Sequence, residues 1–318
     1  MRTSNREAAV TSTRSLVIAL IALLGCMPGF EPCGRAATQP NVIAWGAGMT
    51  ATGSSPNLGQ SIVPNSCTNA AEVAGGAWQS LALRGNGSLI GWGYDKLGET
   101  NFPPTSNYLA VASGFQFNLA LETNGTVVAA GDNSFGQTSV PLGLSNVVSI
   151  ACGFYHGLAL KSDGTVAAWG GLGAVDDGQG VVPAGLSNVV AIAAGSFYNL
   201  VLKSDGTLLA WGENNAGQTN IPADATNVVA ITAGAEHNVV LKSDGTVRFW
   251  GSNEYGQLTT TNNFTNVVAI SAGGWHTLAL TTDGHVLAWG AGSSTNSVDF
   301  GQNIVPASAT NIIQVAGG

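Results

Sequence analysis

Charged side chains are scarce in this sequence of 318 residues, and basic ones are the scarcest. Charged residues make up 9% of the chain, with 10 Lys and Arg against 18 Asp and Glu. Four basic residues fall within the first 35 positions, so residues 36–318 carry 6 basic and 16 acidic side chains, a net charge of −10. Such a surface repels the phosphates of nucleic acid and argues against nucleic-acid binding. It suits a basic protein or a cation better, although acidity also simply aids solubility.

Motifs that carry chemistry are also missing. The chain has no His-Glu-x-x-His, no Gly-x-Ser-x-Gly and no phosphate-binding loop, so we expect no catalysis and no cofactor. Its four cysteines do not form a disulfide framework. Cys33 and Cys67 could pair in an oxidising compartment, whereas Cys152 stands where other repeats have alanine and is expected to be a small core residue.

The histidines and aspartates that recur through the chain do not predict a metal site. Each histidine of the first set begins a strand, where hydrogen bonding at a sheet edge is the expected role rather than zinc binding. Each aspartate of the second set precedes a turn glycine and lacks the further ligands of a calcium loop. The first set is His156, His237 and His276, and the second is Asp163, Asp205, Asp244 and Asp283.

Residues 1–25 predict an export signal. Three arginines precede the apolar run 16–24, which is too short to span a bilayer as a mature helix. Leu23-Leu24-Gly25-Cys26 resembles a bacterial lipobox, in which Cys26 would be lipidated, while residues 34–36 offer a competing cleavage site. A lipoprotein of the outer membrane or cell surface and a freely secreted protein therefore remain alternatives. Residues 26–40 have no periodicity and predict a tether.

From residue 41 onward the sequence consists of repeats. The turn glycines Gly87, Gly125, Gly164, Gly206, Gly245 and Gly284 are 38 to 42 residues apart. A fixed period of this size indicates a solenoid or a propeller. In the unit 189–222, three apolar strands are expected near 189–193, 200–203 and 207–211, with a weaker fourth near 219–222. The Asp-Gly or Asn-Gly pair between the second and third favours a tight hairpin.

The strands are apolar on both faces, so each sheet must be covered on both sides. A propeller meets this requirement because each blade lies between two others. The tryptophans of Trp-Gly pairs are expected between blades, although Ala130 replaces one of them. Residues 41–318 thus predict an all-β, seven-bladed β-propeller of four-stranded blades of about 40 residues. The two ends are expected to share the closing blade, which lacks its second strand after Gly318, and we favour a longer natural chain.

The segments 150–160 and 270–280 resemble the repeat of the regulator of chromosome condensation family. Ile-Ala-Cys-Gly-Phe-Tyr-His-Gly-Leu-Ala-Leu is the first of them. With Trp-Gly, Gly-Gln-Thr and a closing proline, the units look more like the secreted bacterial propellers that inhibit β-lactamase, whose ring is also closed by its ends. The resemblance spans residues 41–318 and implies the fold rather than the activity. Nucleotide exchange and chromatin binding, the roles of the eukaryotic regulator, do not suit an exported acidic chain.

Strand direction predicts which connections share a face. The turn after each first strand and the loop after each third strand emerge at one end of the blade, where varied loops on a rigid scaffold favour recognition. Two residues past each first-strand glycine lie residues that we expect to ring the central opening: Trp78, Gln116, Tyr155, Phe197, Glu236 and Trp275. The loops after the third strands add Tyr94, Phe135, Asp176, Asp177, Glu213 and Tyr255.

The sequence therefore predicts an exported, monomeric, non-catalytic protein-binding module that uses this face. One alternative is an inhibitor of a secreted or periplasmic enzyme such as a β-lactamase, which requires a large aromatic interface. A second is a carbohydrate-binding or lyase-like propeller, which requires carboxylates or aromatic rings converging in the central opening.

Overall fold

The computed structural model describes residues 42–46, 58–259, 264–291 and 301–318. The chain divides into two compact units, residues 1–36 and 37–318, and every described residue belongs to the second. The expected export signal and tether, with Cys26 and Cys33, lie outside the described residues. No helix in the described part of the chain is long and apolar enough to cross a membrane.

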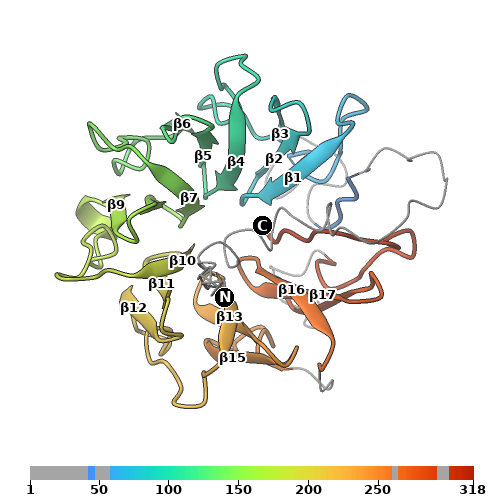
Figure 1. Cartoon of the computed structure of the whole chain (residues 1–318). Helices are drawn as coiled ribbons and strands as arrows, with labels where there is room; N and C mark the ends of the chain where they lie inside the picture. Colours follow the sequence, from blue (N-terminus) through green and yellow to red (C-terminus); the bar gives the residue numbers. More distant parts are fainter. Residues whose placement is uncertain (1–41, 47–57, 260–263, 292–300) are drawn as a thin grey trace, which may run out of the picture. The chain divides into compact units, whose positions relative to one another are not determined.

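The described strands form six antiparallel sheets of three strands each (Figure 1). In each sheet the strands lie in chain order, and we name them inner, middle and outer. The sheets are β1 (Ala70–Gly75), β2 (Gln79–Arg84) and β3 (Leu89–Gly93); β4 (Tyr108–Ser113), β5 (Phe117–Glu122) and β6 (Val127–Gly131); β7 (Val147–Cys152), β8 (His156–Lys161) and β9 (Val166–Gly170); β10 (Val189–Ala194), β11 (Tyr198–Lys203) and β12 (Leu208–Gly212); β13 (Val228–Ala233), β14 (His237–Lys242) and β15 (Val247–Gly251); β16 (Val267–Ala272), β17 (His276–Thr281) and β18 (Val286–Gly290). A 3₁₀ turn, η1 (Gly173–Val175), follows β9.

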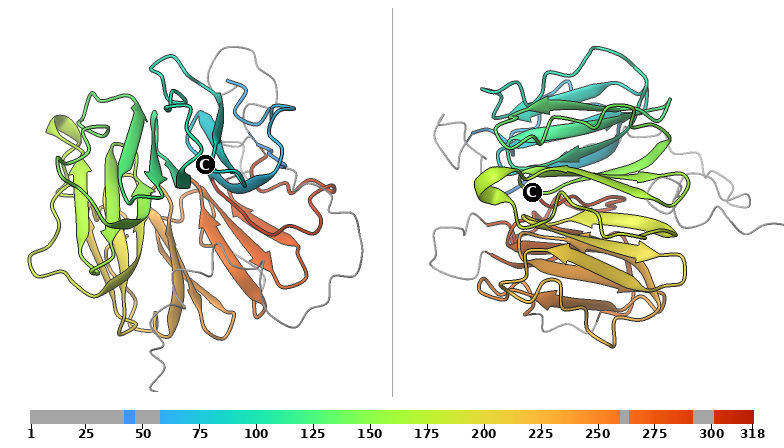
Figure 2. Two further views of the ribbon diagram at one scale, coloured as in Figure 1. Left: turned by 45° about the horizontal axis from the view of Figure 1, so that its top comes forward. Right: turned by 90° about the vertical axis from the view of Figure 1, so that its left-hand side faces the viewer.

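The six inner strands face a common centre, and each contacts the inner strand of the next sheet (Figures 1 and 2). The middle strands are buried on both faces, as in β11, where Leu200, Val201 and Leu202 are 0–2% exposed. Leu200 and Leu202 belong to a cluster with Val240 and Trp250 of the following sheet. A strand that is apolar on both faces is thus explained by a sheet on either side of it.

Two kinds of buried hydrogen bond repeat between neighbouring sheets. Trp250 Nε1 donates to the carbonyl oxygen of Gln218 at 3.0 Å, and the other Trp-Gly tryptophans donate to the matching glutamine. In four of the six described sheets the first residue of the middle strand also bonds to the next sheet, as His156 Nε2 does to Asn199 Oδ1 at 2.8 Å. His237 Nε2 similarly lies 3.0 Å from Thr277 Oγ1, so the edge role expected for these two histidines is confirmed.

The expected fourth strand is absent from every described sheet. The segment after β12 forms local turns instead, with the Asn220 amide donating to the Gly217 carbonyl and the Ala225 amide to the Pro222 carbonyl, at 3.1 and 3.0 Å. These bonds use the backbone groups that a ladder would need, and Pro222 has no N–H to contribute. The prediction of four-stranded blades was wrong, because a segment with alternating character but many turn residues satisfies its backbone within itself.

Ala130 is 7% exposed, so its blade is not left open where the tryptophan is missing. The interface of β1–β3 with β4–β6 contains Tyr108, 3% exposed, where the inner strands of the four following sheets begin with valine. The Tyr108 ring lies 6.1 Å from Phe102, and its hydroxyl donates to the Pro103 carbonyl at 3.0 Å. Two other aromatic rings thus supply bulk to this interface.

The two end segments lie against the first and last described sheets. Trp45 Nε1 donates to the Gln302 carbonyl at 2.9 Å, and Trp45, Val305 and Ile312 pack against Leu278 and Leu280 of β17. The Gly317 amide donates to Ser271 Oγ at 2.9 Å. These contacts repeat those between consecutive sheets.

Candidate functional site

The turn after each inner strand and the loop after each outer strand are joined by a backbone hydrogen bond. The amide of Asp132, the first residue after β6, donates to the carbonyl of Gln116 in the β4–β5 turn at 2.9 Å. The same bond joins Tyr94 to Trp78, Glu213 to Phe197 and Ser252 to Glu236. We call these connections the inner turns and the outer loops, and their common side the loop face. The hairpin turns lie at the opposite strand ends, on what we call the turn face. The predicted grouping of connections is confirmed.

The glycine that ends each outer strand makes this bond possible. Gly212 has φ +104°, and a Cβ at that position would lie 2.4 Å from the carbonyl oxygen of Phe197. A side chain would therefore collide with the oxygen that anchors the outer loop. The Trp-Gly pair in the sequence marks both the packing of the tryptophan and the start of the loop.

Seven aromatic rings from four consecutive sheets form one continuous cluster on the loop face. Centroid separations include 4.7 Å for Trp78 and Phe115, 5.4 Å for Phe115 and Phe154, and 6.1 Å for Phe154 and Phe197. Every ring is half-buried. We call this cluster the aromatic patch, and its members are Trp78, Tyr94, Phe115, Phe135, Phe154, Tyr155 and Phe197.

Two members of the patch, Phe115 and Phe154, were missed by the sequence reasoning. They lie one residue past the inner-strand glycine, where the chain offers Ala77, Ser196 and Ala235 in other repeats. Backbone bonds join these positions from sheet to sheet, with the Phe115 amide donating to the Phe154 carbonyl at 3.3 Å. Their signal was an aromatic residue in a slot otherwise filled by small residues.

The residues expected to ring the central opening are divided between two places. Trp78 and Trp275 line a central cavity of about 420 Å³, whereas Tyr155, Phe197 and Glu236 do not. Gln116 is also half-buried outside the lining. In each two-residue turn the residue after the glycine lines the cavity, whereas among the second residues only Trp78 and Trp275 are in the described lining. The prediction of one aromatic ring around the opening was therefore wrong.

The remaining predicted residues lie in the outer loops. Tyr255 pairs with Trp275 at 5.8 Å, apart from the aromatic patch. Asp176 and Asp177 are exposed beside η1, and their hydrogen bonds stay within their own loop, to Gly178 and Gln179. The structure therefore brings Phe135 and Tyr94 into the patch and leaves these two aspartates outside it.

Three carboxylates follow the last ring of the aromatic patch in the connections of the loop face. Glu213 follows Phe197 through the backbone bond, and Glu236 occupies the inner turn of the next sheet. Burial, and then the charges of Glu213 and Glu254, raise the pKa of the Glu236 carboxyl. We call Glu213, Glu236 and Glu254 the acidic trio.

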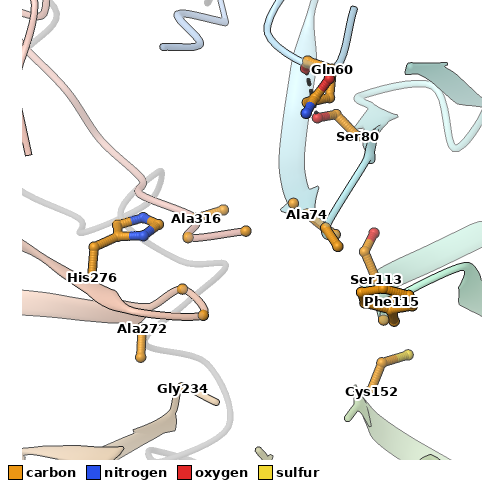
Figure 3. Close-up of a pocket in the computed structure, with 18 of the residues that line it drawn as sticks. Gln60, Ala74, Ser80, Ser113, Phe115, Cys152, Gly234, Ala272, His276 and Ala316 are labelled. Carbon is orange, nitrogen blue, oxygen red and sulfur yellow. Dashed lines mark hydrogen bonds between the residues drawn. The ribbon is translucent and has the colours of Figure 1, made fainter. Parts of the chain in front are cut away.

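The central cavity itself is lined mainly by small side chains at the ends of the inner strands (Figure 3). Ser113, Cys152 and Ala272 are typical, and no Asp, Glu, Lys or Arg is among the described lining residues. Burial raises the pKa of the Cys152 thiol far above its usual range, which disfavours the thiolate. The converging carboxylates required by a lyase-like propeller are not found among the described residues of this cavity.

Successive three-stranded antiparallel sheets around a common centre define an all-β repeat protein of the propeller class. The model of the regulator of chromosome condensation (RCC1) repeat matches residues 109–137, 147–171, 189–218, 228–257 and 267–296. Five RCC1-family repeats are thus recognised between residues 109 and 296. No curated protein sequence matches it.

Solved structures match the fold at low identity. Yeast RCC1 (Prp20), solved bound to Kap60, matches with TM-score 0.67 and 20% identity over 98% of this chain and 90% of that one. Human WBSCR16 matches with TM-score 0.60 and 21% identity over 77% of this chain and 84% of that one. The ectodomain of the Physcomitrella patens receptor kinase CR4 matches with TM-score 0.55 and 20% identity over 71% of this chain and 64% of that one. These findings support the wider family resemblance, and the likeness to β-lactamase inhibitors stays a prediction.

Proposed function

We propose that this chain is an exported, monomeric, non-catalytic binding module that holds a protein partner on its loop face. The aromatic patch carries the proposal. Seven half-buried rings in contact, contributed by four sheets, present a preformed apolar surface with little side-chain freedom left to lose. Aromatic residues of this kind are the usual anchors of protein interfaces.

The scaffold that we infer is a seven-bladed ring whose closing blade combines both ends of the described chain. Each Trp-Gly tryptophan donates to a glutamine carbonyl of the preceding sheet, and Trp45 makes that bond to Gln302 across the two ends. The Gly317 bond to Ser271 Oγ likewise matches the bond from Ala272 to Thr232 Oγ1. A closed ring would hold the patch rigid.

Relatives of the same fold support protein binding outside or inside the cell. Yeast RCC1 has been solved bound to Kap60, and the CR4 domain is an ectodomain of a receptor kinase. Export of this chain rests on the basic and apolar segments of residues 1–25. Intact mass of the exported protein tests it, because a diacylated start at Cys26 supports the anchor and an unmodified start near Ala37 supports free secretion.

A capture experiment with matched variants tests the binding role. The purified protein and its Tyr155→Ala/Phe197→Ala variant would be immobilised and exposed to extracellular and periplasmic extracts. The control, Leu109→Ala/Leu142→Ala, removes two exposed apolar side chains, at 56% and 105%, outside the patch. We expect a protein that wild type and control retain and the patch variant releases, with the affinity of the purified pair reduced at least about tenfold.

Equal capture by all three proteins, or capture by none, would refute the loop-face proposal. Circular dichroism and urea midpoints establish that the variants are folded. A purified β-lactamase, assayed with and without the protein, tests the inhibitor alternative, and inhibition lost in the patch variant would favour it.

A further inference from the structure

The charges of the described residues are divided unequally between the two faces. Pairs of 3.0–3.7 Å with Lys, Arg or His engage four carboxylates at and near the hairpin turns. On the loop face, Lys96 is the one Lys or Arg in the described inner turns and outer loops, and no ion pair joins the described residues there. The turn-face pairs are Lys161–Asp163, Lys203–Asp205, Arg248–Asp224 and His285–Asp283.

The acidic trio is the densest part of this unbalanced charge. Glu213 and Glu254 each raise the pKa of the Glu236 carboxyl, which places the three charges within mutual influence. Glu213 Oε1 accepts a hydrogen bond from Asn215 at 2.9 Å, but Glu213 Oε2 is buried and accepts none within the described chain. A buried carboxylate oxygen without a donor is costly, and it adds to the uncompensated negative charge of the trio.

The trio lies between two aromatic surfaces. On one side, the Glu213 amide donates to the Phe197 carbonyl at 3.0 Å, and Phe197 is the last ring of the aromatic patch. On the other side, Tyr255 follows Glu254 in the chain and stacks edge-on with Trp275. A cation entering here would meet carboxylates and ring faces together, an arrangement that favours a guanidinium or ammonium group.

We infer that the partner of the loop face presents a segment in which Arg or Lys is flanked by apolar side chains, with the cation held by the acidic trio and the apolar neighbours on the aromatic patch. This inference rests on the proposed binding role and adds the chemistry of the partner. Complementary charge sets which partner is accepted and how fast it associates, while the apolar contact supplies most of the affinity.

Selection from a random dodecapeptide phage library tests the inference and needs no identified partner. The protein would be immobilised, and binders also retained by the Tyr155→Ala/Phe197→Ala variant would be removed. We expect the surviving peptides to be enriched in Arg or Lys next to aromatic or aliphatic residues. Synthetic peptides would then be measured by fluorescence polarisation at low and high salt.

Two triple variants with equal net charge separate local recognition from overall acidity. Glu213→Gln/Glu236→Gln/Glu254→Gln should weaken peptide binding at least about tenfold and flatten its salt dependence. The control, Asp163→Asn/Asp205→Asn/Asp244→Asn, removes three charges on the turn face and should leave binding unchanged. Both changes have precedents in the chain, since Gln116 occupies the position of Glu236, and Asn124 that of the turn aspartates.

The outcomes separate the inference from the function on which it rests. Patch-dependent peptides without basic residues, or equal weakening in both triple variants, would overturn the inference and leave the binding role standing. A selection that yields no patch-dependent peptide would count against the binding role itself, and the inference would fall with it.

Discussion

Trp45 is the side chain by which the closure of the ring can be measured. Its indole donates to Gln302, 257 positions away in the chain, and it packs on the cluster around Leu278 and Leu280. If the end segments form a blade equivalent to the others, Trp45→Ala should destabilise the protein as Trp250→Ala does. Trp250, 6% exposed, makes the same kind of bond between consecutive sheets and is the matched control.

The expected magnitudes follow from burial. Replacing a buried tryptophan by alanine costs about 3–5 kcal/mol, which includes the transfer of the ring and the cavity left behind. Trp250→Ala should reach this range. Trp45 is half-buried and should lose about 2–3 kcal/mol, because part of its ring already contacts solvent. Loss of the indole hydrogen bond to the Gln302 carbonyl adds about 1 kcal/mol.

Urea unfolding followed by circular dichroism gives both losses as shifts in midpoint at a common slope. Limited proteolysis adds a second reading, since Trp45→Ala should expose the segment 301–318 to cleavage before the sheets unfold. If the free energy of unfolding of Trp45→Ala lies within about 0.5 kcal/mol of wild type while Trp250→Ala shows its full loss, closure by the two ends is refuted.

Three further substitutions test the buried groups and the loop anchor. Burial raises the pKa of Glu72 to about 7, above its unfolded value of about 4.3. The stabilising contribution of Glu72 is therefore lost as the pH rises through 7. The free energy of unfolding of Glu72→Ala, measured in urea, should exceed that of wild type by about 3 kcal/mol at pH 8 but not at pH 4. Burial lowers the pKa of His156 to about 4, so stability falls as the pH drops from about 6.5 to 4. The variant His156→Gln, which introduces the residue that Gln79 provides at the same position of β2, should lose less stability over that pH range. Gly212→Ala should cost about 1–3 kcal/mol and lower the Tm more than Gly143→Ala, which also has positive φ but no atom within 4 Å of its added Cβ.

Much of the fold could be predicted because its signals are local and repeated. The Asp-Gly and Asn-Gly pairs set each hairpin, and runs that are apolar on both faces require sheets on both sides. The fourth strand was mispredicted because strand formation depends on a neighbour with free backbone groups. Around Pro222 the chain forms turns within itself, and no pattern of side chains reveals that competition.

The candidate site was predicted at the level of connections but not of individual side chains. Strand direction alone placed Phe197 and Glu213 on one face, and a backbone bond joins them there. The residue after the glycine lines the cavity in every such turn, and Phe115 and Phe154 were missed because the second residue was expected there instead. The period of the sequence determines where such a turn lies, whereas its side-chain directions depend on three-dimensional contacts.

The same backbone bond explains how the loop face can vary while the scaffold does not. The anchor of each outer loop is a main-chain carbonyl, contributed equally well by Trp78, Gln116, Phe197 or Glu236. Because the side chain takes no part in this bond, its type is free to serve recognition without loss of the turn. On the turn face the aspartate side chains themselves close the hairpins, as Asp163 does with the Thr165 amide at 3.0 Å, and the sequence there scarcely changes between repeats. Variation is therefore concentrated where only the backbone is needed for folding, and that is the face on which the aromatic patch and the acidic trio lie.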